Sequence, residues 1–163
     1  MKKAHILYFD DEIFIMTTEF GGPLCFILEY IESLDIVNKI DRIDRPEDAE
    51  KAMKENNYDL LILDIRIEKS QGGERNSYKD IPWERTGVEL IRRIREGDIK
   101  GKTTLSVPII VITAVTDVPT LQRIELHGKG KDPEDPLFIR IIQKPPRLAD
   151  IGRAIQDAIS WIK

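Results

Sequence analysis

Residues 5–12 read HILYFDDE, an apolar stretch that runs directly into three acidic residues. Three other stretches are equally short, rich in Ile, Leu and Val, and nearly continuous: residues 60–63, 109–112 and 139–142. Continuous apolar runs of this length are typical of strands buried on both faces, as in a parallel sheet covered by helices. A fifth stretch, residues 36–43, alternates apolar and polar residues and predicts a strand with one less protected face.

Segments with apolar residues at helical spacing separate these runs. They cover residues 24–34, 46–56, 86–96, a stretch beginning near 116, and 148–162. Pro46 stands at an early helical position and is followed by acidic residues, both of which are helix-start signals. Because strands and helices alternate, the sequence predicts an α/β fold: a doubly wound, five-stranded parallel sheet joined by right-handed crossovers.

Composition limits the class of protein. The chain has 163 residues, of which 41% are apolar and 33% charged, as expected for one soluble globular domain. The net charge of −4 argues against a general affinity for nucleic acid. The single cysteine, Cys25, excludes an internal disulfide and a multi-cysteine metal site. No apolar run approaches the roughly 20 residues needed to span a bilayer, so we expect a cytoplasmic protein.

Polar residues suited to phosphoryl transfer follow the predicted strands. They are Asp10 and Asp11 after the first strand, Asp64 after the third, Thr113 after the fourth and Lys144 after the fifth. Ligands gather where the carboxyl ends of parallel strands meet. Clustered carboxylates favour a hard cation such as Mg²⁺, and a carboxylate can attack phosphorus to form an acyl phosphate. A shared metal requires the first and third strands to be neighbours, which predicts the strand order 2-1-3-4-5.

Five stretches, taken together, resemble the receiver domain of bacterial response regulators. They read HILYFDDE, DLLILDIRI, TGVELIRRIRE, PIIVITAV and IIQKPP, and they are spread over nearly the whole chain. The resemblance implies a flavodoxin-like fold and a role in two-component, phosphorelay signal transduction. The donor would be a histidine kinase or a histidine phosphotransfer protein. The chain would be a phosphoprotein with self-catalysed phosphorylation and autodephosphorylation only, not an enzyme that acts on a separate substrate.

The resemblance also implies a role for each polar residue at the strand ends. Asp64 would be the phosphoacceptor. The ligands of a Mg²⁺ ion would be the carboxylates of Asp10, Asp11 and Asp64 and the backbone carbonyl of Arg66. Two other side chains would act on the phosphoryl group: Thr113 through a hydrogen bond and Lys144 through an ion pair. The peptide bond between Lys144 and Pro145 is often cis in this family.

The chain departs from the family pattern at several positions. Ile141 occupies a position in the fifth strand that usually holds an aromatic residue and takes part in the switch. Arg66 and Val115, which flank the path of an attacking water in the family, are expected to alter dephosphorylation. We interpret residues 1–163 as a single receiver domain with loop insertions near residues 17–22, 68–85 and 127–136. We expect a stand-alone receiver.

The output of such a receiver would be a contact with another protein, with no direct binding to nucleic acid or membrane. The sequence specifies neither that downstream protein nor the oligomeric state. Tyr78, Ile81 and Trp83 are apolar residues in the otherwise polar stretch 68–85. One hypothesis is that phosphorylation is read through this loop; the alternative is that the loop packs on its own domain.

Other functions fit the sequence less well. A degenerate receiver could act as a phosphorylation-independent binding scaffold, which the unusual residue at Ile141 and the insertions favour and the complete set of strand-end residues disfavours. Phosphatases of the haloacid dehalogenase kind use a D-x-D motif after the first strand, whereas this chain has Asp10, Asp11 and Glu12 there. Neither a G-x-G-x-x-G fingerprint nor a P-loop follows the first strand, which argues against nucleotide-binding enzymes.

Overall fold

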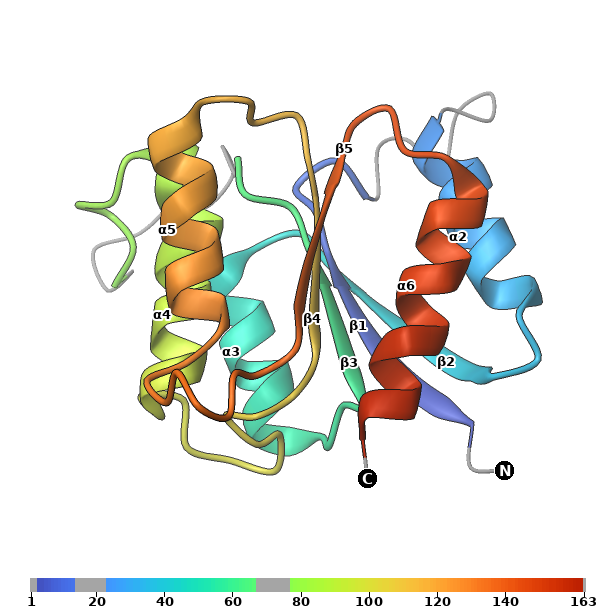
Figure 1. Cartoon of the computed structure of the whole chain (residues 1–163), viewed down its shortest axis with the longest axis horizontal. Coiled ribbons are helices and arrows are strands. Elements are labelled where there is room, and N and C mark those ends of the chain that lie inside the picture. The colour runs from blue at the N-terminus through green and yellow to red at the C-terminus, as the bar shows by residue number, and fades with distance from the viewer. Residues whose placement is uncertain (1–2, 14–22, 67–76, 163) are drawn as a thin grey trace.

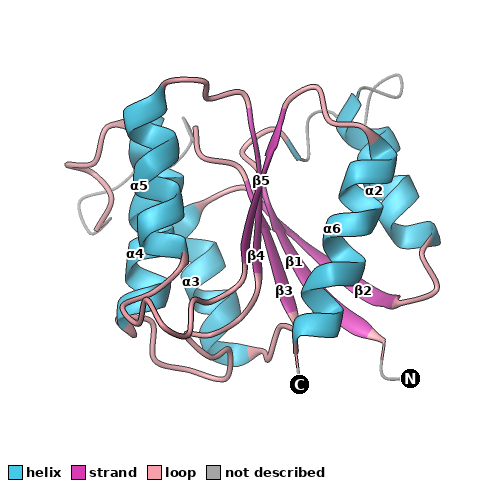
Figure 2. Cartoon of the chain, in the orientation of Figure 1, coloured by secondary structure: helices cyan, strands magenta, loops and turns pink. Residues whose placement is uncertain are grey.

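The computed structural model describes residues 3–13, 23–66 and 77–162. Its centre is one parallel sheet of five strands: β1 (Ala4–Phe9), β2 (Val37–Ile43), β3 (Leu60–Leu63), β4 (Ile109–Thr113) and β5 (Ile139–Gln143). The order across the sheet is β2-β1-β3-β4-β5, which confirms the predicted topology. Figure 2 shows this sheet edge-on between two layers of helices.

Helices cover both faces of the sheet (Figure 1). One face carries α2 (Pro23–Ser33) and α6 (Leu148–Trp161). The opposite face carries α3 (Pro46–Glu55), α4 (Thr86–Glu96) and α5 (Val118–Gly128). A short 3-10 helix, η1 (Trp83–Arg85), leads into α4. No helix of the described residues is long and apolar enough to cross a membrane; the expected cytoplasmic location stays a prediction.

The three central strands, β1, β3 and β4, contribute alternate residues to two apolar layers. In β1, Leu7 packs on the side of α3, α4 and α5, whereas Ile6 and Tyr8 pack on the side of α2 and α6. The same alternation holds in β3 and β4, where the residues facing both layers are buried. Burial on both faces explains why these strands are continuously apolar in the sequence.

Element boundaries agree with the sequence prediction to within two residues. The expected loop at 127–136 needs correction. Helix α5 continues through Gly128, so His127 lies in its last turn and the loop begins at Lys129. The reason is close packing: a Cβ atom at Gly128 would lie 2.0 Å from Cδ1 of Ile139. Glycine lets the end of α5 reach the start of β5, and short-range sequence patterns do not reveal such a contact.

The end of the predicted 68–85 insertion packs on the domain itself. Tyr78 is fully buried, its hydroxyl donates a hydrogen bond to Oε1 of Glu50 at 3.2 Å, and the guanidinium of Arg93 lies 4.0 Å from its ring centre. Ile81 packs against the same apolar layer. The predicted insertion at 17–22 and residues 68–76 lie outside the described residues. The single-domain interpretation and the hypothesis that the 68–85 loop reads phosphorylation stay predictions.

Candidate functional site

Three carboxylates meet at the carboxyl ends of β1 and β3. The adjacent strands bring them together, because the backbone N–H of Asp64 donates to the carbonyl of Phe9 at 2.8 Å. Asp10, Asp11 and Asp64 are 2%, 8% and 7% exposed, and one carboxylate oxygen from each lies within 4.8 Å of the others. Oxygens bound to the same Mg²⁺ are at most about 4.2 Å apart, so the arrangement is close to what one ion requires.

Lys144 supplies the positive charge of this group. Its Nζ lies 3.1 Å from Oδ2 of Asp64 and 3.3 Å from Oδ2 of Asp10. The backbone fixes Lys144 beside β4, since its N–H donates to the carbonyl of Thr113 at 2.8 Å, and the bond to Pro145 is cis as expected. One ammonium group thus bridges two of the three carboxylates.

Burial dominates the electrostatics of the group. It raises the pKa of Asp64 to about 6, and the charge of Asp10 adds to this effect, whereas Lys144 opposes it. Burial by itself would lower the pKa of Lys144, but the charges of Asp64 and Asp10 outweigh it and raise that pKa. Beneath the carboxylates, burial followed by the charges of Asp10 and Asp64 raises the pKa of Tyr8. The site therefore favours additional positive charge.

Thr113 and Arg66 are at the same edge of the sheet but make no direct bond to this charged group among the described residues. Thr113 ends β4 and is completely buried, and its Oγ1 accepts a hydrogen bond from the backbone N–H of Val115 at 3.1 Å. Arg66 is exposed, and its charge helps to lower the pKa of Asp117, after the larger contribution of the hydrogen bonds from Thr120. The roles predicted for Thr113 and for the Arg66 carbonyl stay predictions.

An apolar pocket beside the carboxylates was not anticipated from the sequence. It has a volume of about 310 Å³ and is lined by Leu24 and Ile27 of α2, by Pro145 and Pro146, and by Asp10, Glu12 and Lys144. The helical spacing of Leu24 and Ile27 predicts that they share a face of α2, but it does not predict that they lie beside Lys144. The pocket places apolar surface within reach of a molecule that approaches Asp64.

No protein-family model matches the chain, and no curated protein matches it in sequence. Several solved structures are similar to it in fold. A signal receiver domain of an HD domain-containing protein from Pseudomonas fluorescens Pf-5 is 15% identical, with a TM-score of 0.65 over 98% of this chain and 96% of that one. A Francisella response regulator receiver domain is 15% identical, with a TM-score of 0.64 over 99% and 100%.

The signal receiver domain of a modulated diguanylate cyclase from Desulfovibrio desulfuricans G20 is 23% identical, with a TM-score of 0.57 over 98% of this chain and 95% of that one. This chain has the fold of a response-regulator receiver domain. Receiver domains of this fold serve in signalling, and the acidic cluster of this chain is compatible with that class.

Within this receiver fold, the start of α4 packs directly on the backbone of Asp64. A Cβ atom at Gly87 would lie 2.5 Å from the Asp64 carbonyl oxygen and 2.6 Å from Cα of Ile65. The N–H of Gly87 donates to the carbonyl of Ile65 at 3.0 Å, and the N–H of Ile65 donates to Oδ1 of Asp64 at 2.7 Å. Any larger residue at 87 would displace the segment that orients the Asp64 carboxylate.

Proposed function

We propose that the chain is a phosphoacceptor receiver in which Asp64 takes a phosphoryl group from a phosphohistidine and thereby changes a contact with another protein. One observation carries the proposal: the buried Asp64 carboxylate follows β3, lies within 4.8 Å of the carboxylates of Asp10 and Asp11, and is bonded to Lys144. A purely structural aspartate would not require two further buried carboxylates beside it, because like charges at short range oppose one another.

In the proposed reaction, an oxygen of Asp64 attacks phosphorus and forms a new P–O bond. The P–N bond to the donor imidazole breaks, and its electron pair stays on the imidazole nitrogen, which takes up a proton. Lys144 is within ion-pair distance of Asp64. After the transfer, its ammonium group would form an ion pair with a phosphoryl oxygen. Thr113 would donate its hydroxyl to another phosphoryl oxygen.

The donor set of the site fits Mg²⁺, since three buried carboxylates supply the oxygen ligands that this ion prefers. Asp10, Asp11 and Asp64 would hold it together with the Arg66 carbonyl. The bound ion would supply positive charge that offsets the charge of the phosphoryl oxygens. Lys144 forms ion pairs with two of the three acids, Asp10 and Asp64.

A histidine kinase or a histidine phosphotransfer protein is the proposed donor. The apolar pocket formed by Leu24, Ile27 and Pro146 adjoins Asp10 and Lys144, and it would pack against the protein that carries the phosphohistidine. We place this exchange in the cytoplasm.

A second candidate function is a binding scaffold that is never phosphorylated. Ile141 favours it, because this partly buried aliphatic residue packs against the apolar layer under α4 and α5 where the family usually has an aromatic residue. A branched aliphatic side chain has few rotamers and no ring to move between buried and exposed states.

Labelling by a small phosphodonor separates the two functions. Wild type incubated with acetyl phosphate and Mg²⁺ should gain the mass of one phosphoryl group, and a chelator should abolish the gain. Asp64→Asn should not be labelled, whereas Glu12→Gln, which changes a neighbouring exposed acid, should be labelled like wild type. Absence of labelling in folded, Mg²⁺-binding wild type would support the scaffold, and labelling of Asp64→Asn at the wild-type rate would place the nucleophile elsewhere.

A further inference from the structure

Strand β5 forms one edge of the sheet, and its hydrogen-bonding pattern is fixed at both ends. The N–H of Ile109 donates to the carbonyl of Phe138 at 3.1 Å, and the N–H of Lys144 donates to the carbonyl of Thr113 at 2.8 Å. In a parallel ladder, alternate residues direct their backbone groups to the neighbouring strand. The N–H and C=O groups of Ile139, Ile141 and Gln143 therefore point away from β4, toward the open edge.

The two edges of the sheet differ in how they are protected. The β2 edge has the sequence VNKIDRI and carries a Lys39–Asp41 ion pair at 2.8 Å. Charged edge strands discourage pairing with other chains. The β5 edge has the sequence IRIIQ, with Arg140 as its one charged residue. By this criterion β5, and not β2, is the edge that can receive another strand.

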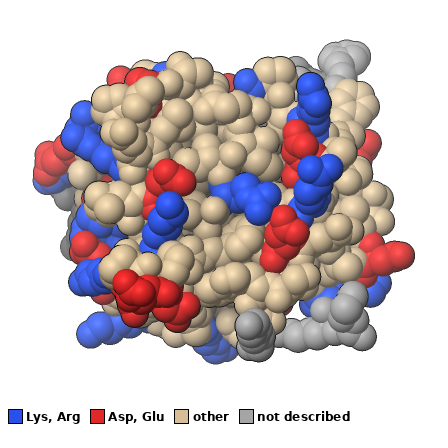
Figure 3. Space-filling model, viewed as in Figure 1, with Lys and Arg blue, Asp and Glu red and all other residues tan. Residues whose placement is uncertain are grey.

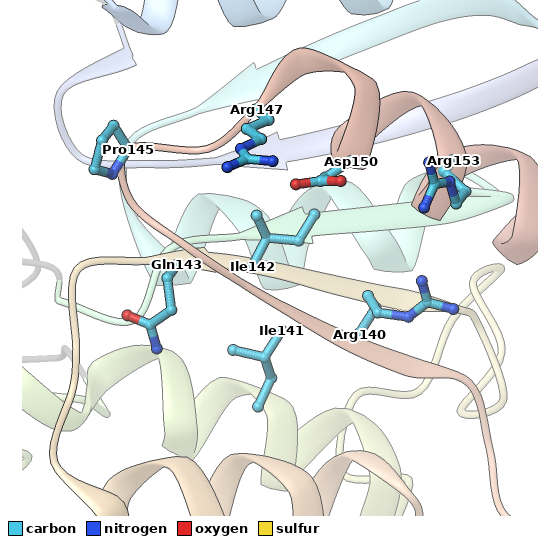
Figure 4. A pocket seen from close by; sticks show the side chains of 8 residues that line it. All are labelled: Arg140, Ile141, Ile142, Gln143, Pro145, Arg147, Asp150 and Arg153. Carbon is cyan, nitrogen blue, oxygen red and sulfur yellow. The ribbon is translucent and has the colours of Figure 1, made fainter.

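A groove runs along β5 beside α6 (Figure 4). Its volume is about 370 Å³; β5 contributes residues 140–143, and α6 with the turn before it contributes Arg147, Asp150 and Arg153. In Figure 3, basic and acidic side chains alternate on this side of the molecule. Arg140 forms an ion pair with Asp157 at 3.1 Å. Within the described chain neither Arg147 nor Arg153 has an ion-pair partner, and the two arginines outnumber the one acid of the groove, Asp150.

We propose that the open edge of β5 binds an extended segment of a partner protein as a sixth strand, with acidic side chains at alternate positions directed toward Arg147 and Arg153. Main-chain hydrogen bonds to Ile139, Ile141 and Gln143 would supply affinity, as in other cases of strand addition. Side chains alternate between the faces of a strand, so every second residue of the segment would face α6. The proposal does not depend on phosphorylation of Asp64.

Charge selects this occupant over a second copy of the chain. Pairing of two β5 edges would bring two grooves of net positive charge to one interface, since Arg147 and Arg153 outnumber Asp150 in each, and like charges across paired strands destabilise the pairing. An acidic strand meets the same arginines with opposite charge. The chain as a whole has a net charge of −4, so this positive groove is a local feature and not a consequence of overall composition.

Backbone methylation of a peptide tests the proposal directly. A short fluorescent peptide of alternating Glu and Val should bind the full chain in a polarisation assay. Two further peptides carry N-methyl groups at the odd or at the even residues and keep the same charge. One of them should bind at least about tenfold more weakly because it lacks the donors that face β5, while the other should retain affinity. Equal binding of both would overturn strand addition in favour of charge attraction alone.

Protein variants and amide exchange provide independent readouts. Arg147→Gln and Arg153→Gln should each weaken binding severalfold, whereas Arg123→Gln, an exposed arginine of α5 outside the groove, should not. The peptide should protect the amides of Ile139, Ile141 and Gln143 from hydrogen exchange. Failure of the unmethylated peptide to bind, equal binding of a Lys–Val peptide, or occupation of the edge by a second copy in sedimentation experiments would each overturn the proposal.

Discussion

The two ends of the sheet bury charge in opposite ways. At the amino ends of β4 and β5, Arg95 is 5% exposed, and its guanidinium donates four hydrogen bonds to backbone carbonyls. The acceptors are those of Leu105 at 2.6 Å, Val107 and Gly128 at 2.7 Å, and Phe138 at 3.0 Å. Burial lowers the pKa of Arg95 to about 10, which leaves it charged near neutral pH.

At the carboxyl ends, Asp10, Asp11 and Asp64 lie together with Lys144. Backbone carbonyls are neutral and fixed, so they satisfy Arg95 without any counter-ion, and the arginine holds three segments in place. The carboxylates of Asp10, Asp11 and Asp64 repel one another, and Lys144 forms ion pairs with Asp10 and Asp64. Arg95 is thus a completed structural element, whereas the cluster at the carboxyl ends keeps like charges close together, which is the arrangement expected of a cation site.

Replacing Arg95 should have the largest effect. Arg95→Met removes all four hydrogen bonds and leaves buried carbonyls without donors, so we expect the free energy of unfolding to fall by about 3–5 kcal/mol. Urea denaturation followed by circular dichroism measures this loss. Arg123→Met, at an exposed position on α5, is the matched control and should change stability little. A loss below about 1 kcal/mol for Arg95→Met would show that the carbonyls are satisfied in another way.

Titration of Asp64 should produce the next largest effect. Its carboxyl titrates near 3.8 when unfolded and near 6 when folded, so the folded protein binds an additional proton between these values. The free energy of unfolding in chelator should therefore decrease as the pH rises from about 4 to about 7, by on the order of 1–3 kcal/mol. Asp64→Asn should lack this decrease and be the more stable protein at pH 7. Identical pH profiles for the two proteins would contradict the raised pKa.

Mg²⁺ should remove part of this instability. At about ten times its dissociation constant the ion should stabilise wild type by about 1.4 kcal/mol, which thermal unfolding at several Mg²⁺ concentrations measures. Asp11→Asn should lose the response, and Glu12→Gln should keep it. An equal response of wild type and Asp11→Asn would remove Asp11 from the metal site.

The smallest effect is expected at the segment before η1. Tyr78→Phe deletes the hydrogen bond to Glu50 but keeps the ring beneath Arg93, so stability should fall by about 0.5–1.5 kcal/mol. Acetyl phosphate labelling of Asp64 should remain at the wild-type rate, because Tyr78 belongs to the packing of the domain. A large loss of labelling with unchanged stability would instead connect this segment to the phosphorylation site.

The strand order and the clustering of Asp10, Asp11 and Asp64 could be predicted from the sequence. Continuous apolar runs are a local consequence of burial on both faces, and the carboxyl end of each strand is read from where its run stops. Asp10, Asp64 and Lys144 were therefore predictable as neighbours once the topology was inferred, and the structure places them within hydrogen-bonding distance of one another through Lys144. The cis bond before Pro145 was anticipated only through the resemblance to receiver domains.

The partners of the other buried polar groups are visible only in the folded chain. The sequence offers Arg92, Arg93 and Arg95 within one helix. Helical spacing from Val88 and Ile91 puts Arg95 nearest the apolar face, but it does not show which groups that arginine meets. Arg95 bonds to Gly128 and Phe138, which are 33 and 43 residues away along the chain. The open side of β5 and the pocket beside Lys144 likewise depend on how α2, α6 and the strands pack. Periodicity records which face of an element is buried, but the partner of a buried charge is set by distant segments that only the folded chain brings together.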